Sequence, residues 1–241
     1  MIVIAHRGSS KKAPENTLPA FRRAIQDKAD ALEIDVQLTK DRQVVVIHDE
    51  WLNRTTNGQG FVCDVSYEYI RRLDAGSWFQ AQFKGTQVPA LEEVLLLAKE
   101  HDMPLHIELK NNFVPQPGIE EKVIRFIHDY QLEERVILSS FRLDSLKICR
   151  ELAPHIRRGY LCWNILQLFN EERAWESLEL HSLHPHVSMV SSLLMSLQQK
   201  GYSIYPYVIE RKSELSRCIQ HQVDGVFTNY PGKVKKIISA G

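Results

Sequence analysis

Short apolar runs rich in β-branched residues recur along the whole chain, and amphipathic helical patterns lie between most of them. Nine runs are typical of strands: residues 2–5, 31–36, 44–47, 105–109, 136–138, 159–161, 187–190, 204–209 and 225–227. Six stretches are typical of helices: residues 18–29, 91–99, 120–130, 143–152, 171–180 and 214–222. Strands that alternate with helices predict a parallel sheet in an α/β protein.

The spacing of the second and third runs reduces the nine strands to eight parallel ones. Only residues 37–43 separate these two runs, whereas a parallel crossover needs about a dozen residues. The third run is therefore expected to return antiparallel, as one arm of a β-hairpin that turns near Lys40 and Asp41 and places His48 opposite Asp35. The eight remaining strands, about 30 residues apart, predict a (β/α)8 TIM barrel.

Residues 50–88 do not fit a simple strand–helix unit. They contain NRTTNGQG and DAGSWFQAQFKG, which are rich in turn residues. We expect a small insertion over the C-terminal mouth of the barrel, with a short helix near residues 67–73. A barrel of this type usually takes about 250 residues, so residues 1–241 are expected to form a single domain.

Composition and charge exclude several classes of protein. The chain has 44% hydrophobic and 25% charged residues, as ordinary globular proteins do, and its 30 basic residues balance 30 acidic ones. This balance gives no reason to expect binding to nucleic acid or to an anionic membrane. The first residues lack the basic start of a signal peptide, and no stretch approaches the about 18 apolar residues of a membrane anchor. The scattered Cys63, Cys149, Cys162 and Cys218 are typical of free thiols, so we expect a cytoplasmic protein.

Charged side chains gather where the predicted strands end. Alternate residues of a strand share one face, so Glu33 and Asp35 point the same way, and His6 continues the face of the first strand. Glu108 takes the same place on the strand at residues 105–109, and the hairpin returns His48 to this rim. Because active sites of TIM barrels lie at the C-terminal rim, these residues form a candidate active site.

The residue types indicate the chemistry of this rim. Three carboxylates without a cysteine suit Mg²⁺ or Ca²⁺. Arg7 and Lys110 suit the oxygens of a phosphate group, and His6 and His48 suit proton transfer near neutral pH.

Two other features have structural interpretations. In the PENT motif, Asn16 or Thr17 can cap the first helix, but capping does not explain Glu15. His106 is expected to lie deeper in the barrel as a structural residue, and the seven histidines not yet named are interpreted as structural too.

Ten motifs spread over the chain resemble those of the glycerophosphodiester phosphodiesterase family. They are HRG at 6–8, PENT at 14–17, EIDVQLTKD at 33–41, VVIHD at 45–49, NRTTNGQG at 53–60, LDAGSWF at 73–79, PALEEVL at 89–95, IELK at 107–110, SSF at 139–141 and VDGVFTNYP at 223–231. The resemblance covers nearly the whole chain and is densest in its first 110 residues.

The resemblance implies metal-dependent hydrolysis of glycerophosphodiesters to sn-glycerol 3-phosphate and an alcohol. Glu33, Asp35 and Glu108 correspond to the metal ligands, His6 and His48 to the acid/base pair, Arg7 and Lys110 to phosphate contacts, and Glu15 to a residue near the metal and the glycerol. The metal would be Mg²⁺ or Ca²⁺, and the partner a small-molecule substrate. The oligomeric state is left open.

The chain departs from the family pattern in one place. Where many relatives read VWTVN, this chain has Tyr207 in place of the tryptophan and Glu210 in place of the asparagine. Tyr207, together with Phe141, keeps an aromatic wall beside the substrate. The departure leaves open which alcohol is preferred.

Two alternatives remain. The first is a related lipid phosphodiesterase, of the lysophospholipase D or phosphoinositide type, with Trp51, Trp78 and Phe79 of the insertion in contact with lipid. The second is a module that binds phosphodiesters without catalysis. Such a module usually lacks a histidine or a carboxylate, and all five are present here.

Overall fold

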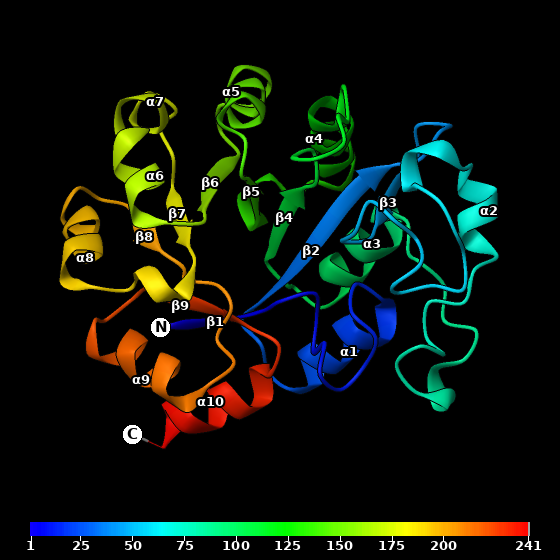
Figure 1. Ribbon diagram of the computed structural model, residues 1–241, viewed down its shortest axis with the longest axis horizontal. Helices are drawn as coiled ribbons and strands as arrows, with labels where there is room; N and C mark the ends of the chain where they lie inside the picture. The colour runs from blue at the N-terminus through cyan, green and yellow to red at the C-terminus, as the bar shows by residue number, and fades with distance from the viewer. Residues whose placement is uncertain (241) are drawn as a thin grey trace.

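Eight parallel strands form a nearly closed barrel in the computed structural model, which describes residues 1–240 (Figure 1). The hydrogen-bonded order is β8-β7-β6-β5-β4-β2-β1-β9. The strands are β1 (Ile2–Ala5), β2 (Ala31–Leu38), β4 (Leu105–Leu109), β5 (Val136–Ser140), β6 (Arg157–Cys162), β7 (Ser182–Pro185), β8 (Ser203–Ile204) and β9 (Gly225–Thr228). The predicted (β/α)8 TIM barrel is confirmed.

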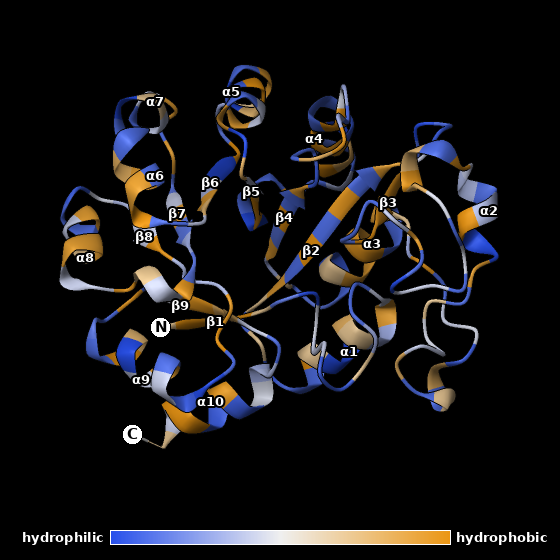
Figure 2. Ribbon diagram, in the orientation of Figure 1, coloured by the Kyte–Doolittle hydropathy of each residue, from blue (hydrophilic) through white to orange (hydrophobic). Residues whose placement is uncertain are grey.

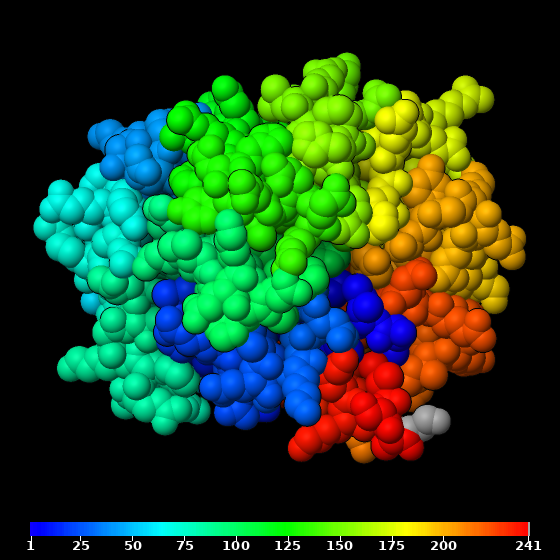
Figure 3. All heavy atoms as spheres, turned by 180° about the vertical axis from the view of Figure 1, so that it is seen from behind, coloured from blue at the N-terminus to red at the C-terminus, as the bar shows by residue number. Residues whose placement is uncertain are grey.

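The barrel closes between its two edge strands without a regular ladder. β8 has only two residues, and the chain beyond it reaches β9 through a single bridge between Ile209 and Thr228. The Ile209 amide donates to the carbonyl of Phe227 at 2.8 Å. β1 and β9 pair in parallel, and α10 (Pro231–Ser239) contacts β1, so the dark blue N-terminal segment adjoins the red C-terminal segment in Figure 3.

Helices connect and cover the strands. They are α1 (Leu18–Gln26), α3 (Leu91–Glu100), α4 (Ile119–Tyr130), α5 (Leu143–Leu152), α6 (Ile165–Asn170), α7 (Glu172–Glu176), α8 (Ser192–Gln199), α9 (Lys212–Gln220) and α10 (Pro231–Ser239). The six predicted helical stretches all contain helix, although residues 171–180 hold only the short α7. Three further helices, α6, α8 and α10, lie outside the predicted stretches.

The two faces of the strands differ as their alternation predicts, and β2 alternates between hydrophilic and hydrophobic bands in Figure 2. Ile34 and Val36 pack outward under the helices in the largest hydrophobic cluster. Ile4 packs with Tyr205 and Phe227 in a small cluster inside the barrel. His106 is buried in the same interior, 5.3 Å from the Phe227 ring centroid, as its structural interpretation requires.

The predicted hairpin exists, but its register is one residue away from the prediction. β3 (Val44–Val46) runs antiparallel to β2 and pairs Val36 with Val46. Asp35 therefore lies opposite Ile47, whose amide donates to the Asp35 carbonyl at 2.9 Å, and the predicted pairing of Asp35 with His48 is wrong. The cause is the turn, because the Thr39 amide bonds the Gln43 carbonyl and centres the loop on Asp41.

The predicted strand at residues 187–190 is wrong. Those residues hold a 3-10 helix, η4 (Val187–Met189), and the barrel strand β7 precedes it. The strand was missed because Ser182 and His184 point into the barrel, where the hydroxyl and the ring nitrogen lie 2.9 Å apart, and so interrupt the apolar pattern. Val187 and Met189 are apolar because they are buried in the hydrophobic cluster on that side of the barrel.

Residues 50–88 form three short helical pieces joined by turns: η1 (Val62–Asp64), α2 (Tyr67–Arg71) and η2 (Ala81–Phe83). Leu52, Val62 and Ile70 form a separate core with Val45 and Ile47 of the hairpin. This small core holds the insertion against the hairpin that carries His48.

Two remaining expectations concern tryptophans and cysteines. The side chains of Trp51 and Trp78 are 51% and 40% exposed, so neither belongs to the core of the insertion. All four cysteines are free thiols. No helix among residues 1–240 combines the length and apolar character needed to cross a bilayer.

Gln37 fixes the segment that carries His48. Its fully buried amide nitrogen lies 3.1, 3.1 and 2.7 Å from the backbone carbonyl oxygens of Ile47, His48 and Asp49. The Gln37 side chain thus donates hydrogen bonds to backbone carbonyls that lie beyond the end of β3 and, among residues 1–240, have no partner in the sheet.

We expect Gln37→Leu to lower the free energy of unfolding by about 1–3 kcal/mol, because buried carbonyl groups lose their donor. For a chain of this size the loss corresponds to a fall of about 2–10 °C in Tm, which differential scanning calorimetry measures. Gln82→Leu, at an exposed glutamine of the insertion, is the matched control. Equal melting temperatures for both variants would contradict the role of Gln37.

Candidate active site

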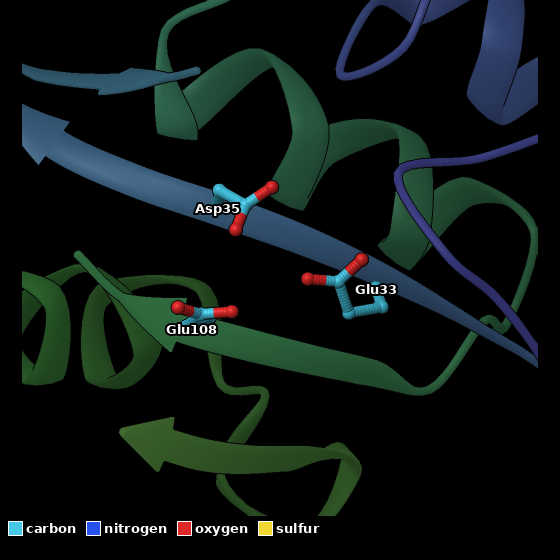
Figure 4. Close-up of side chains that lie close together, drawn as sticks. All are labelled: Glu33, Asp35 and Glu108. Carbon is cyan, nitrogen blue, oxygen red and sulfur yellow. The ribbon is translucent and has the colours of Figure 1, made fainter. Parts of the chain in front are cut away.

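Three buried carboxylates form the centre of the site (Figure 4). Glu33 and Asp35 come from β2 and Glu108 from β4, and the strand register sets Asp35 beside Glu108. One oxygen from each carboxylate lies within 4.8 Å of the others. The side chains that the sequence predicted to share one rim are brought together.

The charges of this cluster are only partly compensated by the protein. Burial and the nearby Asp35 raise the pKa of Glu33 well above its ordinary value, and burial raises the pKa of Glu108 although Lys110 opposes it. Burial would also raise the pKa of Asp35, but His48 and Arg7 outweigh burial and lower it. One buried oxygen of Asp35, Oδ1, has no hydrogen-bond partner.

A divalent cation fits this donor set. Three hard oxygen ligands and an unpartnered carboxylate oxygen are what Mg²⁺ or Ca²⁺ requires. A cation would also compensate charges that otherwise disfavour joint ionisation of Glu33 and Glu108. The three carboxylates are therefore a candidate metal site.

Arg7 is held over the cluster by the turn after β1. Its φ of 57° lies in the left-handed region, and its amide donates to Glu33 Oε2 at 2.7 Å. Gly8 follows with a φ of 81°, and a Cβ there would lie 2.7 Å from the Ala20 carbonyl carbon. Only glycine allows this close approach, so the HRG motif determines where the guanidinium lies.

Lys110 supplies the second cation, just beyond the end of β4. Its Nζ lies 2.7 Å from Glu108 Oε1 and 3.9 Å from Asp35 Oδ1. Burial alone would lower the pKa of Lys110, but Glu108 and Asp35 raise it above its ordinary value. The side chain is therefore a permanent cation in the site.

The two predicted histidines have different partners. His6 Nδ1 lies 2.7 Å from Asn229 Oδ1, and burial, with a smaller effect of Arg7, lowers the pKa of His6 to about 3. His48 Nδ1 lies 2.5 Å from the carboxylate of Asp49. One ring thus faces a neutral amide and the other an anion.

The predicted residues surround a cavity of about 720 Å³. His6, Arg7, Glu33, His48, Glu108, Lys110, Phe141 and Tyr207 all line it. Asp35 is fully buried beneath the cavity, where it contacts Arg7.

Glu15 lies beside Arg7 and does not line this cavity. Its carboxylate accepts from Arg7 and from Arg54, each at 2.8 Å. Burial would raise the pKa of Glu15, but the hydrogen bonds from Arg54 and the charge of Arg7 lower it to about 2. Arg54 also bonds Asp49, so this arginine of the insertion connects the two loops that carry His6 and His48. The NRTTNGQG motif contains Arg54, but nothing in the sequence indicated its contacts with Glu15 and Asp49.

The predicted helix start after PENT is confirmed, with Thr17 at the N-cap, but neither Asn16 nor Thr17 caps the helix with its side chain. The Thr17 side chain donates to the Pro14 carbonyl. Asn16 Nδ2 instead donates to Asp35 Oδ2 at 2.7 Å. The asparagine of PENT therefore orients a carboxylate of the cluster, a role that only the folded loop reveals.

Aromatic side chains form the wall opposite the charged groups. The rings of Phe141 and Trp163 stack with centroids 4.2 Å apart and planes at 15°, and Tyr207 lies nearly perpendicular to both. Trp163 is 53% exposed. The sequence analysis missed it, although it directly follows the end of β6, where strand-end residues face the mouth.

Further lining residues were also missed. They are Asn229, His184 and His186, whereas Glu210, which the sequence already marked as a departure from the family pattern, lines the cavity too. Asn229 directly follows β9, so its place at a strand end was the available signal. His184 lay in the strand that the apolar pattern did not reveal.

Known proteins are similar to this chain in sequence and in fold. A glycerophosphodiester phosphodiesterase of Caldanaerobacter subterraneus subsp. tengcongensis is 43% identical over 243 residues, which cover 100% of this chain and 98% of that protein. A phosphodiesterase of Oleispira antarctica, solved with the product sn-glycerol-3-phosphate, superposes with a TM-score of 0.88 and 32% identity, covering 99% of this chain and 97% of that one.

A glycerophosphodiester phosphodiesterase of Agrobacterium tumefaciens superposes with a TM-score of 0.84 and 27% identity, over 96% of this chain and 97% of that one. The sequence profile described as the glycerophosphoryl diester phosphodiesterase family matches residues 6–233. Together with the cavity and its charged residues, this match identifies the chain as a member of that family.

Proposed function

We propose that the protein hydrolyses glycerophosphodiesters to sn-glycerol 3-phosphate and an alcohol in a metal-dependent reaction. The observation that carries the proposal is the meeting of three buried carboxylates, two cations and two histidines around one cavity. The Oleispira antarctica relative, bound to sn-glycerol-3-phosphate, supports the same substrate class. The free cysteines support a cytoplasmic location.

Glu33, Asp35 and Glu108 would hold the metal, Mg²⁺ or Ca²⁺. Such an ion, when bound, polarises a phosphoryl oxygen and makes a nearby hydroxyl or water a better nucleophile. The protein's part is to keep the three ligands in place, through Asn16 on Asp35 and the Arg7 amide on Glu33.

Arg7 and Lys110 bind the phosphate group. Both cations line the cavity and are fixed by carboxylates, so they need little reorganisation as negative charge develops on the phosphoryl oxygens. Glu15, which the family resemblance placed near the metal and glycerol, acts on the substrate by holding Arg7.

His6 serves as the general base and His48 as the general acid. His6, whose Nδ1 faces the Asn229 oxygen, offers Nε2 to the proton of the nucleophile, which is water or the 2-hydroxyl of the substrate's glycerol. The Asp49 carboxylate beside His48 suits a ring that carries both protons and can give one to the leaving alkoxide.

Phe141, Tyr207 and Trp163 contact the part of the substrate that is not phosphate. Their rings line the cavity opposite the charged residues, so the substrate lies between an ionic side and an aromatic side. Tyr207 replaces the tryptophan that many relatives carry, and its hydroxyl donates to the Cys162 carbonyl at 3.0 Å, which fixes the ring.

Removal of the metal should abolish activity. We expect EDTA to stop the release of glycerol 3-phosphate, and added Mg²⁺ or Ca²⁺ to restore it. Either ion should also raise the Tm of the chelated protein, because a ligand that binds only the folded state stabilises it. Asp35→Asn should lose both responses, whereas Asp64→Asn, on the exposed surface of the insertion, keeps them. Full activity in EDTA would exclude the metal-dependent mechanism.

The two histidines should differ in their response to the leaving group. We expect His6→Ala and His48→Ala each to lower kcat by about 10²–10⁴-fold on glycerophosphocholine. A glycerophospho-p-nitrophenyl substrate, whose leaving group needs no proton, should restore much of the rate of His48→Ala and little of that of His6→Ala. His101→Ala, at an exposed histidine outside the cavity, is the control. The reverse pattern would exchange the two roles.

A panel of head groups separates this function from its alternatives. We expect turnover of water-soluble diesters such as glycerophosphocholine and glycerophosphoglycerol, measured as glycerol 3-phosphate. Turnover of lysophospholipids alone would favour a lipid phosphodiesterase. Binding of the diesters without turnover, with the metal present, would favour a non-catalytic module.

A further inference from the structure

Glu210 lies at the edge of the cavity and contacts the residue that holds His6. Its Oε1 accepts a hydrogen bond from Asn229 Nδ2 at 3.1 Å. The other end of the same amide, Asn229 Oδ1, lies 2.7 Å from His6 Nδ1. Glu210 is therefore one side chain removed from His6.

A carboxylate fixes which way the Asn229 amide points. An ionised glutamate accepts hydrogen bonds and has none to donate, so Asn229 must turn its NH₂ group toward Glu210. Its carbonyl oxygen then faces His6, and that oxygen only accepts. His6 must therefore carry its proton on Nδ1, which leaves Nε2 free to accept a proton.

Among residues 1–240, Ser10 is the third side chain that contacts the Asn229 amide, besides His6 and Glu210. Ser10 does not determine which way the amide points. Its hydroxyl lies 2.8 Å from Asn229 Oδ1 and 3.0 Å from the His6 carbonyl. A hydroxyl can donate to the amide oxygen, or donate to the His6 carbonyl and accept from a flipped amide. Ser10 is compatible with both orientations of Asn229, whereas Glu210 is compatible with one.

The backbone keeps Glu210 in place. The amides of Glu210 and Arg211 both donate to Glu214 Oε2 at 2.9 Å, at the start of α9. This contact fixes the chain that carries Glu210 beside the end of β9.

We propose that Glu210 is a positioning residue that sets the tautomer of His6 through Asn229. This inference deepens the proposed function, on which it rests for the role of His6 as the base. The tautomer itself does not depend on that function and is measured separately.

The test is the tautomer of His6 in the full chain labelled with ¹⁵N, at neutral pH, by two-bond ¹H–¹⁵N correlation. The signals of His6 are assigned by their loss in His6→Ala. In the wild type we expect a protonated Nδ1 and a bare Nε2. In Glu210→Leu, which removes the acceptor, we expect a mixture of tautomers and a fall in kcat of about fivefold, the effect of one ordinary hydrogen bond.

Two further variants separate the hydrogen bond from charge and from general damage. Glu210→Gln removes the charge but keeps an acceptor oxygen, so it should retain most of the Nδ1-protonated form, whereas a pure charge effect would make it resemble Glu210→Leu. Adding Asn229→Asp to Glu210→Leu should restore the Nδ1 proton, because a carboxylate facing His6 can only accept. Glu68→Leu, at a strongly exposed glutamate, controls for loss of a surface charge.

A wild-type His6 protonated on Nε2, or a Glu210→Leu spectrum equal to the wild type, would overturn the proposal. If the spectra change as expected but no glycerophosphodiester is hydrolysed, the proposed function fails and the positioning role stands.

Discussion

The site depends on negative charge that is buried at the C-terminal end of two neighbouring strands. Three carboxylates within 4.8 Å of one another would repel strongly in the barrel interior. Arg7 and Lys110 offset part of this repulsion, and the unpartnered oxygen of Asp35 points to a further cation. The same arrangement that destabilises the folded barrel makes these carboxylates a candidate site for a metal ion.

His48 lies beside the three carboxylates because side-chain contacts hold the β2–β3 hairpin and the insertion against the barrel. The hairpin leaves β2 and carries His48 on backbone that Gln37 fixes from inside. Arg54, from the insertion, then connects Asp49 beside His48 with Glu15 beside Arg7. Side chains from separate strands and loops of the candidate site thus share one set of ion pairs, so movement of the insertion would disturb both halves of the site.

The histidines are chemically similar residues that their partners make different. Asn229 offers His6 a neutral oxygen, and Asp49 offers His48 a charged one. The two rings therefore differ in the charge of the group that faces Nδ1. In the proposed function, this difference sets the direction of proton transfer, and the contact of Glu210 with Asn229 extends the same network to the rim of the cavity.

The sequence by itself determined the barrel, the hairpin and the meeting of the carboxylates with Arg7 and Lys110 at one end of the strands, because period-two alternation and strand-end positions depend only on local geometry. It failed at β7, where Ser182 and His184 face the interior, and at the hairpin register, which the five-residue turn sets. Only the tertiary structure decided the roles of Asn16, Gln37, Arg54 and Asn229, together with the stacking of Trp163 on Phe141. These side chains act through partners distant in the chain, and no local pattern records a contact that exists only after the barrel has closed.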